Sequence, residues 1–210
     1  AYFISFGIVV TSLLSCAVYW WYQESTHQQL ITEAQRRNEQ RALQFSTAIV
    51  EQIDALIRSF DLATHQLRDT YVNNQQHFES AVRGIIDTYP SGCIKYILVF
   101  DADGYLSYSS SGSKERIYFG DREHFRIHID SKEDHLFISK PVFGRVGNVW
   151  VILMTRPIYK DGRFAGVIAI SLQPAYLAQN LAALKVTNAD TITLLRADGS
   201  FLARNYGLDE

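Results

Sequence analysis

The first 23 residues carry no Asp, Glu, Lys or Arg, and this uncharged stretch places the strongest constraint on the fold. It is rich in Ile, Val, Leu and Phe, and about 20 such residues in a helix span the hydrocarbon core of a bilayer. It ends in Tyr19, Trp20, Trp21 and Tyr22, which are amphipathic aromatics of the kind that settle at a membrane–water boundary. We therefore predict a transmembrane helix over residues 1–23.

Two other interpretations of this stretch stay open. A cleaved signal peptide has a shorter apolar core and a small-residue cleavage site, whereas here the apolar run continues through bulky aromatics. Residues 13–16 loosely match a lipoprotein-processing site, which would make Cys16 a lipid anchor. The second cysteine, Cys93, lies in a turn-like stretch, so no disulfide between the two is expected.

A long helix is predicted after the membrane segment, because there is no Pro or Gly between Gln23 and Asn74. Its apolar side chains follow a heptad-like spacing: Leu43, Val50, Ile53, Ile57, Phe60, Leu67 and Tyr71. Such a stripe fits packing against the chain's own domain, or pairing with a second copy, and both can hold. We expect a stalk region over 24–89 that forms a homodimer, with a break at Asn73 and a short second helix that ends before Pro90.

From residue 94 onward the apolar pattern alternates, which indicates strands rather than helices. The predicted elements are strands at 94–100 and 105–109 with an Asp-Gly turn between them, a helical insert at 121–129, strands at 135–143, 148–159 and 163–172, and a helix from Pro174. The fold class is therefore α+β, with an antiparallel sheet of about five strands and helices on one face.

The chain also contains an internal repeat. Residues 191–202 reproduce the strand, Asp-Gly turn and strand of residues 96–106. A repeated unit of this kind predicts a second copy of the same module. We assign 90–185 to a first module and 186–210 to the start of a second, truncated one.

The order of these pieces resembles the double-Cache (PDC) sensor domains of bacterial transmembrane receptors. The resemblance rests on residues 121–125, 141–145, 155–158 and 161–167 together with Trp150. It implies a PAS-like sheet outside the bacterial inner membrane, a membrane-distal first module that binds a small molecule, and a cytoplasmic output domain. Chains of this type most often end in a diguanylate cyclase (GGDEF) domain that makes cyclic di-GMP, while histidine kinases and chemoreceptors share the sensor.

The resemblance also implies a ligand pocket between the sheet and the helical insert that covers it. The residues that this places at the pocket are Tyr118, Arg122, Phe125, His128, Trp150, Met154 and Arg156. The planar guanidinium of Arg122 suits a carboxylate or phosphate. Amino-acid-sensing members carry an Asp near the end of the strand that corresponds to 163–172, and no Asp occurs around Ser171. A small organic anion is therefore the expected ligand.

These residues also have simpler possible roles than binding. Arg122 has three acidic neighbours in the sequence with which it can pair at the surface, and Phe125 and Trp150 are typical core residues. His124 and His128 stand one helical turn apart, but no third metal ligand is convincing, so neither a metal nor a cofactor is predicted.

Other functional classes have no support in the composition or the motifs. A net charge of −2 without a basic run excludes nucleic-acid binding. The segment contains no Gly-rich phosphate loop, no nucleophile elbow and no Cys–His cluster, so it is not expected to be an enzyme. A ligand-free dimerisation scaffold is the alternative to a sensor. Unpaired polar groups beneath the insert would favour sensing, whereas solid packing by Phe125, Trp150 and Met154 would favour the scaffold.

Overall fold

The computed structural model describes residues 2–131, 133–184 and 191–205, and for 2–12, 27–32 and 34 it describes the backbone only. The chain divides into two compact units, Ala1–Asp54 and Ala55–Glu210. The first unit belongs to helix α1 (Tyr2–Asn73). Within the fully described residues, no helix has the length and apolarity to cross a membrane. Residues 1–12 of the predicted span lie outside the described side chains, so the span stays a prediction.

The second unit begins with the last turns of α1 and a short helical hairpin. Helix α1 ends at Asn73, as predicted, and a 3₁₀ turn (Gln75–His77) leads into α2 (Phe78–Thr88). The ring of Phe60 on α1 is fully buried and stacks on Tyr89, with 4.7 Å between ring centroids. The predicted apolar stripe therefore packs against its own domain in this part of α1.

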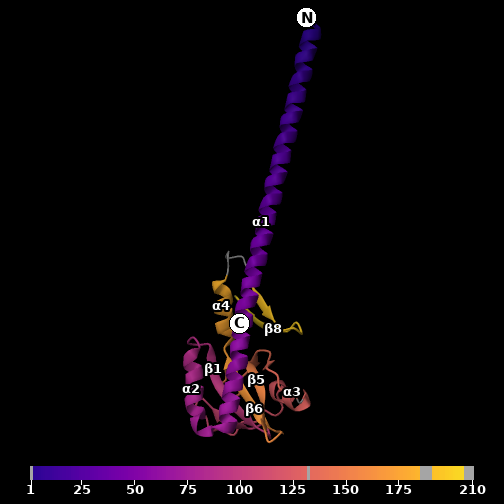
Figure 1. Ribbon diagram of the computed structural model, residues 1–210. Helices are drawn as coiled ribbons and strands as arrows, with labels where there is room; N and C mark the ends of the chain where they lie inside the picture. Colours follow the sequence, from indigo (N-terminus) through magenta and orange to yellow (C-terminus); the bar gives the residue numbers. More distant parts are fainter. Residues whose placement is uncertain (1, 132, 185–190, 206–210) are drawn as a thin grey trace. The chain divides into compact units, whose positions relative to one another are not determined.

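The centre of this unit is an antiparallel sheet (Figure 1). Its strands are β1 (Ile94–Asp101), β2 (Leu106–Ser109), β3 (Phe137–Ile138), β4 (Val142–Phe143), β5 (Trp150–Lys160) and β6 (Arg163–Leu172). The spatial order is β2-β1-β6-β5-β3, and β4 also pairs with β5. The α+β fold is thus confirmed.

The predicted strand at 135–143 is divided into two short strands, β3 and β4. Pro141 lies between them and has no N–H to donate to the ladder of a sheet. The side chain of Ser139 takes over part of the pairing, because its Oγ accepts a hydrogen bond from the backbone N–H of Leu153 at 2.9 Å. Six strands are therefore found where about five were expected.

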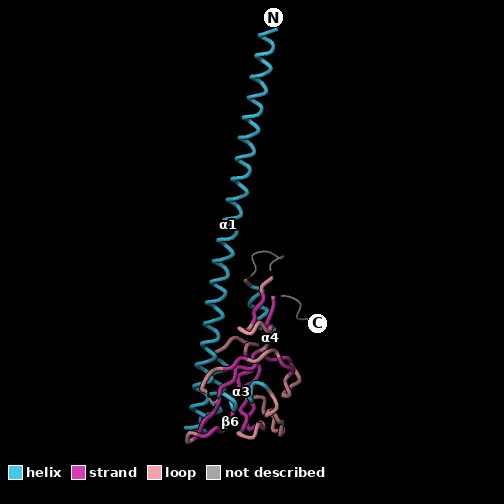
Figure 2. Tube along the Cα trace, turned by 90° about the vertical axis from the view of Figure 1, so that its right-hand side faces the viewer, coloured by secondary structure: helices cyan, strands magenta, loops and turns pink. Residues whose placement is uncertain are grey.

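Helices cover both faces of the sheet, so the prediction of helices on one face was wrong. On β5, Thr155 contacts α3 (Glu123–Ser131), while the next residue, Arg156, contacts α1. On the α1 side, Phe78 of α2 packs edge-to-face on Tyr108 of β2. The tube view in Figure 2 shows the strands together with α1 and α3. Continuous burial along β5 and β6 follows from this double coverage.

The pairing of β1 with β6 depends on a glycine. Gly166 adopts φ 140°, a conformation that side chains disfavour. A Cβ at this position would overlap the carbonyl oxygen of Phe100 on the neighbouring strand. The close approach aligns Phe100 with Val167, and both belong to the core beneath α3.

Beyond helix α4 (Pro174–Ala183) the chain forms a hairpin of β7 (Thr193–Leu195) and β8 (Phe201–Arg204). Its turn matches the β1–β2 turn. Arg196 N–H donates to the carbonyl oxygen of Ser200 at 2.8 Å, and Asp101 N–H donates to Tyr105 in the same way at 2.8 Å. The predicted repeat of strand, turn and strand is therefore confirmed at the level of the hairpin.

Candidate functional site

Helix α3 lies over an apolar face of the sheet. The buried residues that form the core here, called the α3-side cluster below, are Leu98, Phe100, Phe119, Phe125, Val146, Val151, Leu153, Val167 and Ala169. Phe125 reaches this cluster from α3 and meets Phe100 and Phe164 edge-to-face. These side chains are each no more than 7% exposed, so the space between α3 and the strands is mainly apolar.

Two histidines of α3 are buried beside this apolar cluster. His124 is 2% exposed and His128 is 1% exposed. The hydroxyl of Thr155 donates to the carbonyl oxygen of His124 at 3.1 Å, which uses its only proton. The 2.9 Å contact between Thr155 Oγ1 and His128 Nε2 therefore has the imidazole N–H as its donor. Nδ1 of His128 is left with its lone pair as a hydrogen-bond acceptor.

Burial determines the charge of both histidines. Desolvation is the main cause that lowers the pKa of His124 to about 4, and the charge of Arg122 adds to it. Desolvation likewise lowers the pKa of His128 to about 4, and His135 and Arg156 add to it. Both imidazoles are consequently neutral at pH 7 and can each donate one hydrogen bond and accept another.

Several buried polar atoms near α3 lack a partner within the described part of the chain. They include Nε2 of His124, Nδ1 of His128 and Nδ1 of His135. The rings of His128 and His135 lie 5.7 Å apart. Because an unsatisfied buried polar group costs folding free energy, such atoms call for a functional or solvent partner.

The segment that leads into α3 is fixed to the rest of the domain. Arg145 makes a bidentate ion pair with Asp121, with both N–O distances at 2.7 Å, and also donates to the carbonyl oxygen of Tyr118. The hydrogen bond from Arg145 is the main cause that lowers the pKa of Asp121. The ring of Tyr118 packs on Gly120, where a Cβ would clash with it. The start of the insert is thereby anchored.

The structure brings some of the predicted site residues together and separates others. Phe125 and His128 point from α3 toward the sheet, and Arg122 is half-buried directly before α3. Tyr118 and Trp150 are 45% and 59% exposed, and Trp150 packs edge-to-face on Phe143.

Met154 and Arg156 are buried, but they lie on the α1 side of β5, because successive side chains of a strand point to opposite faces. The β5 residues that face α3 are Val151, Leu153 and Thr155.

Arg156 instead joins α1 to the loop that follows α3. Its guanidinium is 3% exposed and pairs with Asp61 of α1 and, at 2.5 Å, with Asp134. Its Nε donates to Thr64 at 3.4 Å. Asp134 also pairs with Arg68 of α1 at 2.8 Å.

Sequence reasoning considered His124 only as a metal ligand and left it out of the pocket, and it missed Thr155, Asp61 and Asp134. The three-residue spacing of Phe125 and His128 indicates one helix face, and His124 belongs to the same face by its one-turn offset from His128. For Thr155 the sequence gives no such signal, because both faces of β5 are apolar on either side of it. The two aspartates meet Arg156 only through the tertiary fold.

No metal centre is found in the described residues, and the thiol of the buried cysteine is unreactive. No group of three or more His, Cys, Asp or Glu side chains within them is placed to hold an ion. Cys93 is buried, and desolvation raises its thiol pKa to about 11. A thiol of this kind is protonated and unreactive at neutral pH.

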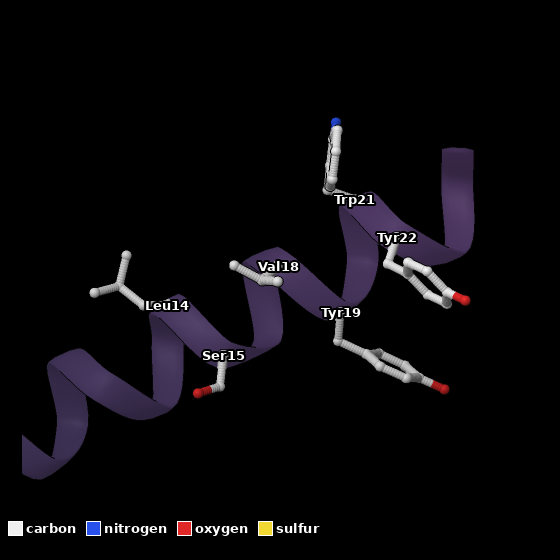
Figure 3. Close-up of a pocket in the computed structure, with 6 residues that line it drawn as sticks. All are labelled: Leu14, Ser15, Val18, Tyr19, Trp21 and Tyr22. Atoms are coloured by element: carbon white, nitrogen blue, oxygen red, sulfur yellow. The ribbon is translucent and has the colours of Figure 1, made fainter. Parts of the chain in front are cut away.

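Two surface hollows lie away from α3. One is a groove of about 440 Å³ between α1 and α2, lined by residues that include Leu62, Gly84 and Tyr89. The other is formed along a single helix by six residues between Leu14 and Tyr22 (Figure 3). Their side chains project outward from that one helix, so the hollow has no opposing wall within this set.

The fold is shared with solved extracellular and ligand-binding domains. The chain is similar to the extracellular domain of a protein described as the histidine kinase rpHK1S-Z16, at 24% identity and a TM-score of 0.63, covering 71% of this chain and 64% of that one. It is also similar to the ligand-binding domain of the Pseudomonas fluorescens chemoreceptor CtaA in complex with L-valine, at 15% identity and a TM-score of 0.58, over 72% and 67%. A third match is the ligand-binding domain of the Pseudomonas aeruginosa chemoreceptor PctB in complex with L-Gln, at 12% identity and a TM-score of 0.55, over 68% and 58%.

No protein-family model and no curated protein matches the chain. The chain spans 64% of the histidine kinase domain and 58% of the PctB domain, which is less than two thirds of each. At these identities the likeness concerns the fold. The chain therefore has the mixed helix and sheet fold that is found in the extracellular domain of a histidine kinase and in the ligand-binding domains of chemoreceptors.

Proposed function

We propose that this chain is the ligand-sensing, extracytoplasmic region of a bacterial membrane receptor. The observation that carries the proposal is the set of buried, unpartnered ring nitrogens beneath α3, above all Nδ1 of His128 and Nε2 of His124. A scaffold would lose folding free energy through such atoms and gain nothing from them. A sensor gains hydrogen-bonding groups in a water-poor site. Phe125 does pack solidly in the core, as a scaffold would require, but the polar atoms beside it favour the sensor.

The ligand is proposed to be a small organic anion held by Arg122. The guanidinium of Arg122 makes no hydrogen bond or ion pair with the fully described residues, and its neighbour Asp121 is already paired with Arg145. The buried polar side chains of the described residues include no Asp or Glu that would balance an ammonium group. CtaA and PctB are seen with L-valine and L-Gln. For this chain we favour an acid without an ammonium group.

The membrane attachment is proposed from the sequence and from surface exposure. The side chains of Tyr19, Trp20, Trp21 and Tyr22 are all more than half exposed on α1, and large exposed apolar side chains indicate an interaction partner. A bilayer around 1–23 supplies that partner. The stalk over 24–89 would then pair with a second copy through residues such as Leu43 and Val50, which are 68% and 55% exposed.

The module at 90–185 is proposed to be membrane-distal, with a second module from 186. The output domain is proposed to be a diguanylate cyclase, on the strength of the sequence resemblance to double-Cache receptors. A histidine kinase or chemoreceptor output is the alternative, and it is supported by the proteins in which the same fold occurs.

A thermal-shift screen tests the ligand proposal. The 210-residue chain in detergent micelles would be heated with di- and tricarboxylic acids, hydroxy acids, L-valine and L-glutamine. A ligand that binds only the folded state raises the midpoint by mass action. We expect an acid to raise the midpoint of the wild type and of Arg163→Ala, which removes an equally positive but exposed side chain. The same acid should not stabilise Arg122→Ala. Stabilisation by the amino acids alone would contradict the proposed ligand class.

A further inference from the structure

Strand β5 and the segment between α3 and β3 each present consecutive residues to opposite faces of the sheet. On β5, Thr155 bonds to the α3 residues His124 and His128, and Arg156 turns to α1. In the segment that follows α3, His135 lies beside His128, and Asp134 turns to α1. On β5 this follows from the alternation of side chains along a strand, and in the segment after α3 it follows from the contacts of the two side chains. Each segment therefore joins the α3 side of the sheet to the α1 side.

Asp134 forms the connection at the α1 side. Its Oδ1 pairs with Nη1 of Arg156 at 2.5 Å, and its Oδ2 pairs with Nη1 of Arg68 at 2.8 Å. Arg68 is a residue of α1, and it also donates to the carbonyl oxygen of Pro157 at 3.4 Å. One carboxylate thus bridges a helix residue and a strand residue.

The second acid of this network comes from α1 itself. Asp61 pairs with the other terminal nitrogen of Arg156, so that the guanidinium is held between α1 and the loop after α3. The Arg156 side chain is 3% exposed, whereas those of Asp61 and Asp134 are 42% and 40% exposed. A buried guanidinium has little freedom to find other partners, so its two acids keep their relative positions.

We propose that Asp134 is a coupling residue that transmits the position of α3 and its following loop to helix α1. A shift of α3 moves His128 and the adjoining His135, and the neighbouring Asp134 then moves Arg68 and Arg156 against α1. The use of this device in signalling rests on the proposed sensing role, because a ligand beneath α3 would be its natural trigger. The mechanical connection itself does not require a ligand.

A double-mutant cycle without ligand tests the connection. Arg145→Ala releases Asp121 and Tyr118 and so loosens the start of the insert. Hydrogen exchange of the α1 amides between residues 61 and 68 would be measured by mass spectrometry on the 210-residue chain. We expect Arg145→Ala to speed this exchange by about five-fold in the wild-type background, the lower end of typical couplings between sites. In the Asp134→Asn background the same change should have less than about two-fold effect.

Two further variants keep the test decisive. Asp130→Asn removes an exposed acid at the end of α3 and should leave the five-fold response intact. Asp61→Asn removes the ion pair between Arg156 and α1 but leaves the 3.4 Å hydrogen bond of Arg156 to Thr64 and the pair of Arg68 with Asp134, so it should reduce the response in part. An undiminished response in Asp134→Asn would overturn the proposal, because the loosening of the insert would then reach α1 through the sheet and not through Asp134. Since no ligand is added, this outcome is separate from a failure of the ligand screen.

Discussion

Acidification should destabilise this protein well above the range in which carboxylates titrate. The groups responsible are His124 and His128, whose pKa values fall from 6.5 to about 4 on folding, chiefly because burial disfavours their charged forms. The unfolded chain therefore binds more protons than the folded chain between these values. The stability that the neutral histidines contribute is complete above pH 6.5 and is lost as the pH falls toward 4.

The size of the effect follows from proton linkage. Each histidine lowers the free energy of unfolding by about 1.4 kcal/mol per pH unit of acidification, in the range where it is protonated only in the unfolded state. Between pH 7 and pH 5 this amounts to about 2 kcal/mol per histidine, or about 4 kcal/mol for the pair.

Other charges near the two rings modify this loss without reversing it. The charges that face His124 are those of Arg122, Arg145 and Asp121, and those that face His128 are His135, Arg156 and Asp134. The lowered pKa values of Asp121 and Asp134 act in the same direction, but only as the pH falls toward and below 3.8, outside the measured window.

Urea titration followed by circular dichroism at pH 7 and pH 5 measures the loss directly. For the variant that carries His124→Gln and His128→Gln, the free energy of unfolding should fall by less than about 1 kcal/mol between pH 7 and pH 5. The control His77→Gln alters an exposed histidine and should retain the full loss. A wild-type loss below about 1 kcal/mol, or an unchanged loss in the double variant, would refute the reasoning.

Three substitutions test the packing. Gly166→Ala should destabilise the protein by about 3 kcal/mol, because its Cβ overlaps the carbonyl oxygen of Phe100; an unchanged urea midpoint would show that β1 and β6 can separate without cost. Gly84→Ala should stabilise α2 by about 1 kcal/mol, since a Cβ there meets no atom within 4 Å, and a lowered midpoint would argue against that open space. Trp150→Ala should cost less than about 1.5 kcal/mol and leave acid binding in the thermal-shift assay unchanged, because the side chain is 59% exposed beside Phe143.

The order and ends of the elements were largely predictable, because local signals mark them. Helix α1 stops at the predicted Asn73, and β6 has the predicted bounds Arg163–Leu172 because turn residues precede it and Pro174 follows. The division between β3 and β4 was missed, although Pro141 marked it. An alternating apolar pattern alone does not show where the hydrogen bonding between two neighbouring strands is interrupted.

The candidate site was predictable only in part. The resemblance to double-Cache domains placed Phe125 and His128 between the insert and the sheet, and both are buried residues of α3. The sequence does not show which β5 side chains point to which face of the sheet, because apolar residues occupy both faces of this strand. The faces on which Met154 and Arg156 lie were therefore not predictable. The contacts of Arg156 with Asp61 and Thr64 join residues that are more than 90 positions apart, and no local pattern encodes them.

The most direct test of the central claim is nitrogen NMR of the ¹⁵N-histidine-labelled chain, with and without the acid that best stabilises it. In the free protein at pH 7, His128 should be neutral with its proton on Nε2, as the hydrogen bond with Thr155 requires. An ionised carboxylate has no proton to donate, so the donor to Nδ1 of His128 has to be the hydroxyl group of a hydroxy acid. On binding of such an acid, the Nδ1 signal of His128 should move in the direction that marks a newly accepted hydrogen bond, while exposed His77 stays unchanged. A stabilising acid that leaves the signals of both His124 and His128 unmoved would place the ligand elsewhere and contradict the account.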